Sequence, residues 1–403
     1  MSKERIVALD GLRGAAILMV MVSHLMILDQ YNGNVVWTFF KAGWMGVDLF
    51  FVLSGFLITD ILLKTRNGEH YFRNFIARRT LRIFPLYYAV LIIVWVCGKI
   101  FSPEATGDSI AWYFTYSSNV GMAIKNNWLH IAGPLEVSHF WSLAVEEQFY
   151  LFWPLVVYFT EARKLIWLCV LMFLAGPFIR MVIGIPFESE SLAAYVMTPA
   201  RMDSLAVGAL LSCIRHVDPA STNPRVILNR VLSIGGAIIS ALALFFVSSQ
   251  LMWVGLSLML ISVAIDLHAK QSKLLLFAFS GIATIGTLYH YSAEYTYSFF
   301  GLFFMMCVNY VVFHRVELAN RLFSSRLMIE LGTYSYSMYI FHHLFQRQWK
   351  SLFESVFFSG KMHELIGQAC YIVVCILITY ALARISWVIL ERPFLKLKDR
   401  FEY

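Results

Sequence analysis

A succession of apolar segments, each close to the length of a membrane-spanning helix, is the feature that most restricts the fold of this chain. Of its 403 residues, 59% are hydrophobic and only 14% are charged, whereas a soluble domain carries about 25% charged residues. The candidate spans are 9–28, 44–63, 83–101, 141–160, 165–184, 195–214, 231–248, 250–267, 274–290, 297–313, 333–349 and 365–390. The sequence therefore predicts an all-α, polytopic integral membrane bundle of about 10–12 transmembrane helices. We expect a single domain over 1–403, without a fused soluble domain.

Basic residues gather in alternate connections between these segments. The connection 64–82 holds two lysine or arginine residues near its start and four near its end, whereas the long connection 102–140 holds only Lys125. Cytoplasmic loops are enriched in lysine and arginine, so we expect both termini to be cytoplasmic. The net charge of +7 then orients the protein in the lipid bilayer and does not indicate nucleic-acid binding.

The six cysteines favour neither disulfides nor a metal site. All of them fall in apolar segments, and none forms a CxxC pair. Cysteines in such surroundings behave as small buried hydrophobic residues. The sequence predicts free thiols and no metal.

Arg13 and His24 lie eleven positions apart in the first apolar segment. Eleven residues make about three helical turns, so the two side chains share one face and lie roughly 16 Å apart along the axis. Ionisable groups inside a membrane are costly and are a functional-site hypothesis by default. With the predicted topology, Arg13 lies near the cytoplasmic end of the span and His24 near the outer end.

Other polar residues fall at the same two depths. Several guanidinium groups at the cytoplasmic side suit the phosphates of a nucleotide-bearing donor, although they could equally anchor the topology. Near the outer side, Glu146 and Glu147 could serve in catalysis or form structural ion pairs with Arg201. Asp48 could simply mark the end of a helix. The basic group comprises Arg13, Arg78, Arg79 and Arg82, and the outer group comprises His24, Glu146, Glu147, Arg201, Asp203, His342 and His343.

From about Arg5 to Lys398 the chain resembles the membrane-bound acyltransferase family 3. The resemblance lies in an arginine-x10-histidine element, a second-helix signature, an arginine-x-x-arginine segment and four later motifs. These are 9–24, 46–58, 79–88, 139–150, 201–203, 335–342 and 391–394. One departure is that His343 and Leu344 stand where the family usually has an aromatic residue and a proline, so these residues do not by themselves predict a kink.

The resemblance implies transfer of an acyl group from acyl-CoA, most often acetyl-CoA, to a hydroxyl of an envelope carbohydrate or glycolipid, such as the O-antigen of lipopolysaccharide. It also implies a bacterial inner-membrane location, with acyl-CoA as co-substrate and no bound cofactor. On the matching positions, His24 is expected to be the catalytic base, assisted by Glu146 or Glu147. Direct transfer and an acyl-histidine relay both remain open.

The remaining motif positions take two further expected roles. Donor binding is expected of Arg13, Arg78, Arg79 and Arg82. Contacts with the acceptor or the transition state are expected of Asp48, Ser54, His139, Arg201, Asp203, Tyr336 and His342. Arg201 or a backbone amide near Ser54 could stabilise the oxyanion.

A proton-coupled transporter is the alternative function. In that hypothesis His24, Glu146 and Asp203 form a proton relay, because carboxylates and imidazoles inside a membrane mark such pathways. A transporter would move solute along a pH gradient and release no thiol from acyl-CoA.

Overall fold

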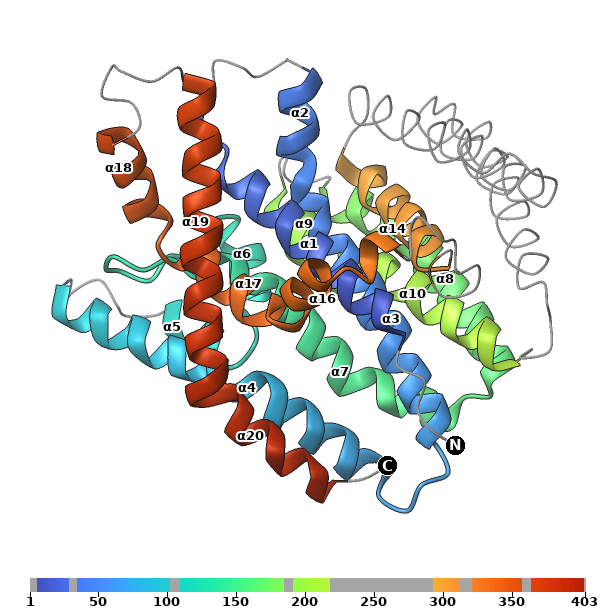
Figure 1. Cartoon of the computed structure of the whole chain (residues 1–403). Coiled ribbons are helices and arrows are strands. Elements are labelled where there is room, and N and C mark those ends of the chain that lie inside the picture. The colour runs from blue at the N-terminus through green and yellow to red at the C-terminus, as the bar shows by residue number, and fades with distance from the viewer. Residues whose placement is uncertain are drawn as a thin grey trace, which may run out of the picture.

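The computed structural model describes residues 6–28, 35–101, 109–184, 191–217, 293–309, 311, 321–356 and 364–401. Within these ranges all regular secondary structure is helical, which confirms the all-α class (Figure 1). The predicted spans 231–248, 250–267 and 274–290 lie outside the described residues.

Five helices in the described part are long and apolar enough to cross a membrane, so the chain is a multi-pass membrane protein. They are Val7–Leu25, Phe39–Thr65, Tyr71–Phe101, Ala162–Ile183 and Glu364–Arg400. These spans contain α1 (Val7–Leu25), α3 (Gly46–Thr65), α4 (Tyr71–Phe101), most of α8 (Ala162–Gly184) and α19 (Glu364–Ser386). The last span continues through a π-helical turn η6 (Trp387–Glu391), α20 (Arg392–Lys396) and η7 (Leu397–Arg400).

The other helices pack around these spans. The larger ones are α7 (Trp141–Phe159), α10 (Thr198–Val217) and α14 (Ala293–Asn309). The shorter ones are α2 (Val35–Lys41), η2 (Ala42–Met45), α5 (Ser109–Phe114), α6 (Ser118–Lys125), η3 (Ser138–Phe140), α9 (Leu192–Val196), α16 (Arg326–Thr333), α17 (Ser335–Leu344) and α18 (Gln346–Val356).

The predicted spans 83–101 and 333–349 differ most from the structure, and the predicted span 195–214 is interrupted between α9 and α10. Helix α4 begins at Tyr71 rather than at residue 83, because arginine is a good helix former and its charge does not end the helix. The predicted span 333–349 is divided among α16, α17 and α18, each too short to cross a membrane alone. The hydroxyl of Ser335 donates to the carbonyl of Gly332 at the first break. Phe345 interrupts the helix after Leu344, so the chain bends there without a proline.

Glycines bring the central helices into close contact. A Cβ on Gly208 of α10 would lie 2.1 Å from the carbonyl oxygen of Val52 on α3, and one on Gly332 of α16 would lie 1.7 Å from that of Asp10 on α1. Such small residues allow membrane helices to approach closely. Helix α1 lies against α3 and α16, and α17 lies beside its C-terminal half (Figure 1). This arrangement places Arg13 and His24 within the bundle.

Candidate active site

Four histidines from three elements meet at one end of α1. His24 comes from α1, His139 from η3, and His342 and His343 from α17. The rings of His24 and His342 are stacked, with centroids 5.2 Å apart, and His343 lies edge-on to His24 at 5.1 Å. His139 lies 5.1 Å from His342 and 4.9 Å from His343. The structure thus unites three predicted site histidines, His24, His139 and His342, with His343.

The hydrogen bonds of His342 define which nitrogen of His24 carries a proton. Nδ1 of His342 lies 2.6 Å from the carbonyl oxygen of Tyr339, so we assign it as the protonated donor. Nε2 of the neutral His342 ring is then an acceptor, and Nδ1 of His24 donates to it across 2.9 Å. In neutral His24 this leaves Nε2 unprotonated. That nitrogen can accept a proton from a hydroxyl.

A cavity of about 330 Å³, here called the histidine cavity, adjoins these rings. His130 Nδ1 and Glu136 Oε2 lie 2.8 Å apart in its wall. Its lining residues are His24, Trp44, Val47, Trp128, His130, Glu136, Ser138, His139, Trp141, Tyr195, Tyr339, His343 and Gln346. Aromatic side chains with a few polar groups are typical of a small-molecule site.

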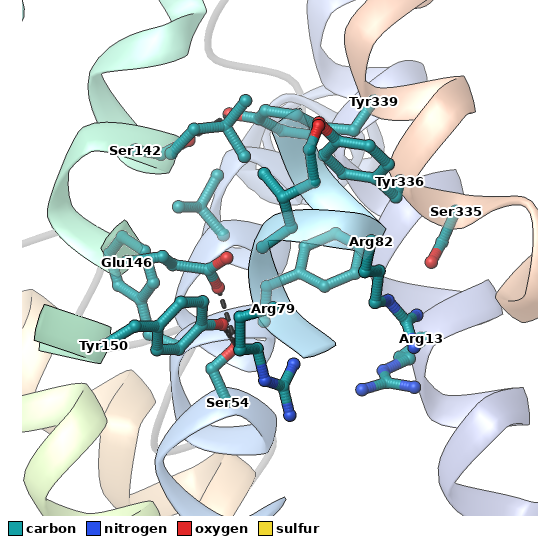
Figure 2. Close-up of a pocket in the computed structure, with 15 residues that line it drawn as sticks. Arg13, Ser54, Arg79, Arg82, Ser142, Glu146, Tyr150, Ser335, Tyr336 and Tyr339 are labelled. Carbon is teal, nitrogen blue, oxygen red and sulfur yellow. Dashed lines mark hydrogen bonds between the residues drawn. The ribbon is translucent and has the colours of Figure 1, made fainter. Parts of the chain in front are cut away.

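A second pocket, the arginine pocket, lies beside the other half of α1 and has a volume of about 80 Å³. Figure 2 shows the guanidinium groups of Arg13, Arg79 and Arg82 on one side of it. Arg79 lies over the rings of Phe75 and Tyr150, at 5.8 and 5.4 Å from their centroids. Three predicted donor residues are therefore neighbours, and the arrangement suits a polyanion.

Glu146 lies in the arginine pocket (Figure 2). It does not line the histidine cavity, to which His24 belongs. Its Oε1 accepts a hydrogen bond from Ser54 at 2.7 Å, and the Tyr150 hydroxyl donates to Ser54 Oγ at 3.0 Å. The residue that contacts His24 in the expected orienting position is His342. Within the described residues, Oε1 of Glu147 is buried and has no hydrogen-bond partner.

Arg201 and Asp203 belong to two buried ion pairs. Arg201 Nη2 lies 2.8 Å from Asp48 Oδ1, and Arg180 Nη2 lies 2.7 Å from Asp203 Oδ2. All four side chains are at most 1% exposed. The suggested pairing of Arg201 with Glu146 or Glu147 is therefore wrong, because Asp48 is its partner. Asp48 does lie in the first turn of α3, but it joins α3 to α10.

Two other predicted residues make contacts with backbone carbonyls. Arg78 Nη1 donates to the carbonyls of Lys398 and Phe401, at 3.2 and 2.8 Å, and so holds the C-terminal segment. Arg78 does not line the arginine pocket. The Tyr336 hydroxyl lines that pocket and donates to the carbonyl of Ile83 at 2.6 Å.

The two cavities meet along one wall. Val47 of α3 and Tyr339 of α17 line both the arginine pocket and the histidine cavity. The Tyr339 hydroxyl is 2.6 Å from Ser142 Oγ and donates to the carbonyl of His139 at 3.1 Å. The two cavities are thus adjacent and share the side chains of these two residues.

The family model for an acyltransferase domain, Acyl_transf_3, matches residues 6–384, which is nearly the whole chain. The chain belongs to acyltransferase family 3. All of the residues that line the two cavities lie within the matched range.

Curated relatives of this acyltransferase family 3 member include bacterial O-acetyltransferases. The peptidoglycan O-acetyltransferase OatA of Listeria monocytogenes is 38% identical over 161 residues, covering 38% of this chain and 24% of the relative. The putative peptidoglycan O-acetyltransferase YrhL of Bacillus subtilis is 33% identical over 229 residues, covering 53% and 34%. The O-acetyltransferase OatA of Staphylococcus aureus is 25% identical over 410 residues, covering 96% and 57%. The matches span a quarter to somewhat over half of these relatives' lengths. No solved structure matches significantly.

Some residues of this family member's site were not predicted from sequence. Arg180 was overlooked, although an arginine inside the apolar segment 165–184 is itself a signal of a buried partner. Tyr150 and Tyr339 stand in recognised motifs, but nothing in the sequence reveals that one contacts Ser54 and the other separates the two cavities.

Proposed function

We propose that the protein is a membrane O-acyltransferase that moves an acyl group, in the simplest case acetyl, from cytoplasmic acyl-CoA to a hydroxyl of an extracytoplasmic envelope carbohydrate. The observation that carries the proposal is the pair of adjoining cavities, one lined by three arginines and the other by His24. Anionic phosphates would bind at the arginines, and a flexible arm would extend roughly 16 Å along α1 to His24.

The proposed reaction begins with an acceptor hydroxyl in the histidine cavity. Nε2 of His24 takes the hydroxyl proton as the oxygen attacks the thioester carbonyl. The C–S bond then breaks, the ester forms, and the thiolate of CoA leaves and takes up a proton. In a two-step variant the same unprotonated nitrogen attacks the thioester, the C–S bond breaks and the thiolate of CoA leaves. The acceptor hydroxyl then takes the acyl group from the nitrogen, and its proton goes to the thiolate.

The names of the relatives suggest the first acceptor to test. Two of them are named for peptidoglycan O-acetylation. We therefore propose a peptidoglycan glycan fragment as the first acceptor, ahead of a lipopolysaccharide O-antigen. The aromatic lining of the histidine cavity, which includes Trp44, Trp128 and Trp141, suits the apolar face of a sugar ring.

The contacts of the three proposed relay residues weigh against the transporter alternative. His24 bonds to His342, Glu146 bonds to Ser54, and Asp203 bonds to Arg180. A proton relay needs consecutive hydrogen-bonded groups, whereas these three residues have separate partners.

The function is tested with purified protein in proteoliposomes, acetyl-CoA and a peptidoglycan-derived oligosaccharide. We expect thiol release that depends on the oligosaccharide, together with an added mass of one acetyl group on the sugar. Solute uptake driven by a pH gradient, with no thiol release from acetyl-CoA, would instead establish the transporter.

His342 is expected to act as a positioning residue for His24. His342→Ala removes the acceptor for Nδ1–H of His24. A general base typically raises the rate 10²–10⁴-fold, and a misoriented base loses part of that factor, so kcat should fall about tenfold or more. The KM for the donor should change little. His342→Gln can restore an acceptor and should recover part of kcat, and exposed His216 provides an alanine control. Equal losses in the Ala and Gln variants would contradict the positioning role.

A further inference from the structure

A third cavity, here called the C-terminal cavity, adjoins the arginine pocket and has a volume of about 260 Å³. The two share Arg13, Arg82 and Tyr336. Its lining residues are Asp10, Arg13, Arg82, Gly332, Thr333, Tyr336, Trp387, Glu391, Leu395 and Lys398. The proposed donor path therefore extends beyond the arginines to the C-terminal segment.

The cations of the C-terminal cavity are more available than its carboxylates. Within the described residues, the side chains of Arg82 and Lys398 have no hydrogen-bond or ion-pair partner. Glu391 Oε1 accepts hydrogen bonds from Ser337 and Ser386, at 2.6 and 3.0 Å. Asp10 Oδ1 lies 3.4 Å from Arg13 Nη1. Two unpaired cations in one cavity favour an anionic ligand.

The position of Lys398 is fixed by contacts between the C-terminal segment and α4. Arg78 Nη1 donates to the carbonyl of Lys398 itself and to that of Phe401. The guanidinium of Arg73 lies 5.8 Å from the centroid of the Phe401 ring. Figure 1 shows α20 running beside α4, and the two helices are in contact. Arg78 does not line the cavity, but it helps to position Lys398 by binding the backbone of that segment.

An aromatic surface accompanies these charges. Trp387 lines the C-terminal cavity and is itself held edge-on by Tyr334, with ring centroids 5.6 Å apart. Nucleobases stack on such rings regardless of base identity. An aromatic face and two cations in one cavity match a nucleoside phosphate.

We propose that the C-terminal cavity binds the nucleotide end of the acyl-CoA donor, with Arg82 and Lys398 at its phosphates and Trp387 against its adenine ring. This assignment rests on the proposed function. It adds to the donor site a set of residues from the C-terminal segment of the chain. The arm of the donor would run from this cavity through the arginine pocket toward His24.

The test compares two donors that differ only in the nucleotide. For acetyl-CoA, Lys398→Ala should raise KM about tenfold, because one charge-assisted phosphate contact is lost. For S-acetyl-pantetheine, which lacks the nucleotide, the same variant should match the wild type. Lys396→Ala is the control, since Lys396 is exposed and two residues away. Unchanged KM for acetyl-CoA, or equal losses with both donors, would overturn the assignment.

A binding measurement keeps this inference separate from the proposed reaction. Titration of the purified protein with free coenzyme A should show binding that Lys398→Ala weakens about tenfold and Lys396→Ala leaves unchanged. If the wild type binds coenzyme A in this way but releases no thiol from acetyl-CoA, the cavity assignment stands and the proposed reaction fails. If the wild type and the Lys398→Ala variant bind equally well, the cavity assignment fails.

Discussion

Replacing His24 with alanine should lower kcat for acyl transfer by at least about 100-fold, because a positioned general base typically contributes 10²–10⁴ in rate. The hydrogen bonds of His342 leave Nε2 of His24 as the unprotonated nitrogen. Alanine removes that nitrogen, and Glu146, which accepts a hydrogen bond from Ser54 in the arginine pocket, is not placed to replace it. Acetyl-CoA-dependent acetylation of the oligosaccharide is the measurement.

His70→Ala is the matched control for this experiment, because His70 is exposed and lies just before α4. Both variants should reach wild-type expression and elute alike in size-exclusion chromatography. Wild-type turnover by His24→Ala would remove His24 from the mechanism. Mass spectrometry of wild-type protein mixed with acetyl-CoA alone then separates the two chemical routes, since only the relay leaves an acetyl group on the His24 peptide.

Replacing Asp48 with leucine should destabilise the protein by about 3–5 kcal/mol, the usual cost of breaking a buried ion pair. The loss would leave the Arg201 guanidinium buried without its carboxylate, and two of its nitrogens, Nε and Nη1, already have no hydrogen-bond partner within the described residues. The centroid of the Tyr297 ring lies 3.9 Å from the guanidinium carbon of Arg201, but this ring carries no compensating negative charge. Thermal unfolding in detergent, followed by tryptophan fluorescence, measures the effect.

The double variant Asp48→Leu/Arg201→Met distinguishes charge burial from packing. Removing both charges should recover most of the lost stability, because the uncompensated charge is gone. The exposed pair of Lys64 and Asp60 is the control, and Lys64→Ala should cost less than about 1 kcal/mol. If the double variant were as unstable as Asp48→Leu, packing rather than charge would explain the loss.

The sequence was sufficient for the helical class and for placing Arg13 and His24 eleven positions apart on one helix. Helical periodicity relates Arg13 to His24, and hydropathy locates the long apolar segments. The proximity of Arg13 to Arg79 and Arg82 also follows from charge topology alone. These features depend on local sequence, which is why they could be predicted.

The partners of the buried groups could not be predicted in this way. Whether Glu146 faces His24 or Ser54 depends on the rotation of α7 about its axis, which is set by contacts with helices distant in the sequence, such as that between Glu146 and Ser54 of α3. The pairing of Arg201 with Asp48 joins positions 153 residues apart in the chain. The division of 333–349 into short helices depends on local hydrogen bonds, such as that from the Ser335 hydroxyl to the carbonyl of Gly332, and an average of hydropathy over a window does not detect such bonds.

The wall formed by Val47 and Tyr339 has a consequence for energy coupling in the proposed reaction. An acyl group would pass this wall outward, and the hydrogen of the acceptor hydroxyl would return inward to coenzyme A. Formally, one acylium cation would move outward and one proton would move inward. The two positive charges cancel, so no net charge would cross the membrane. Transfer would then be electroneutral, driven by the thioester and indifferent to the membrane potential.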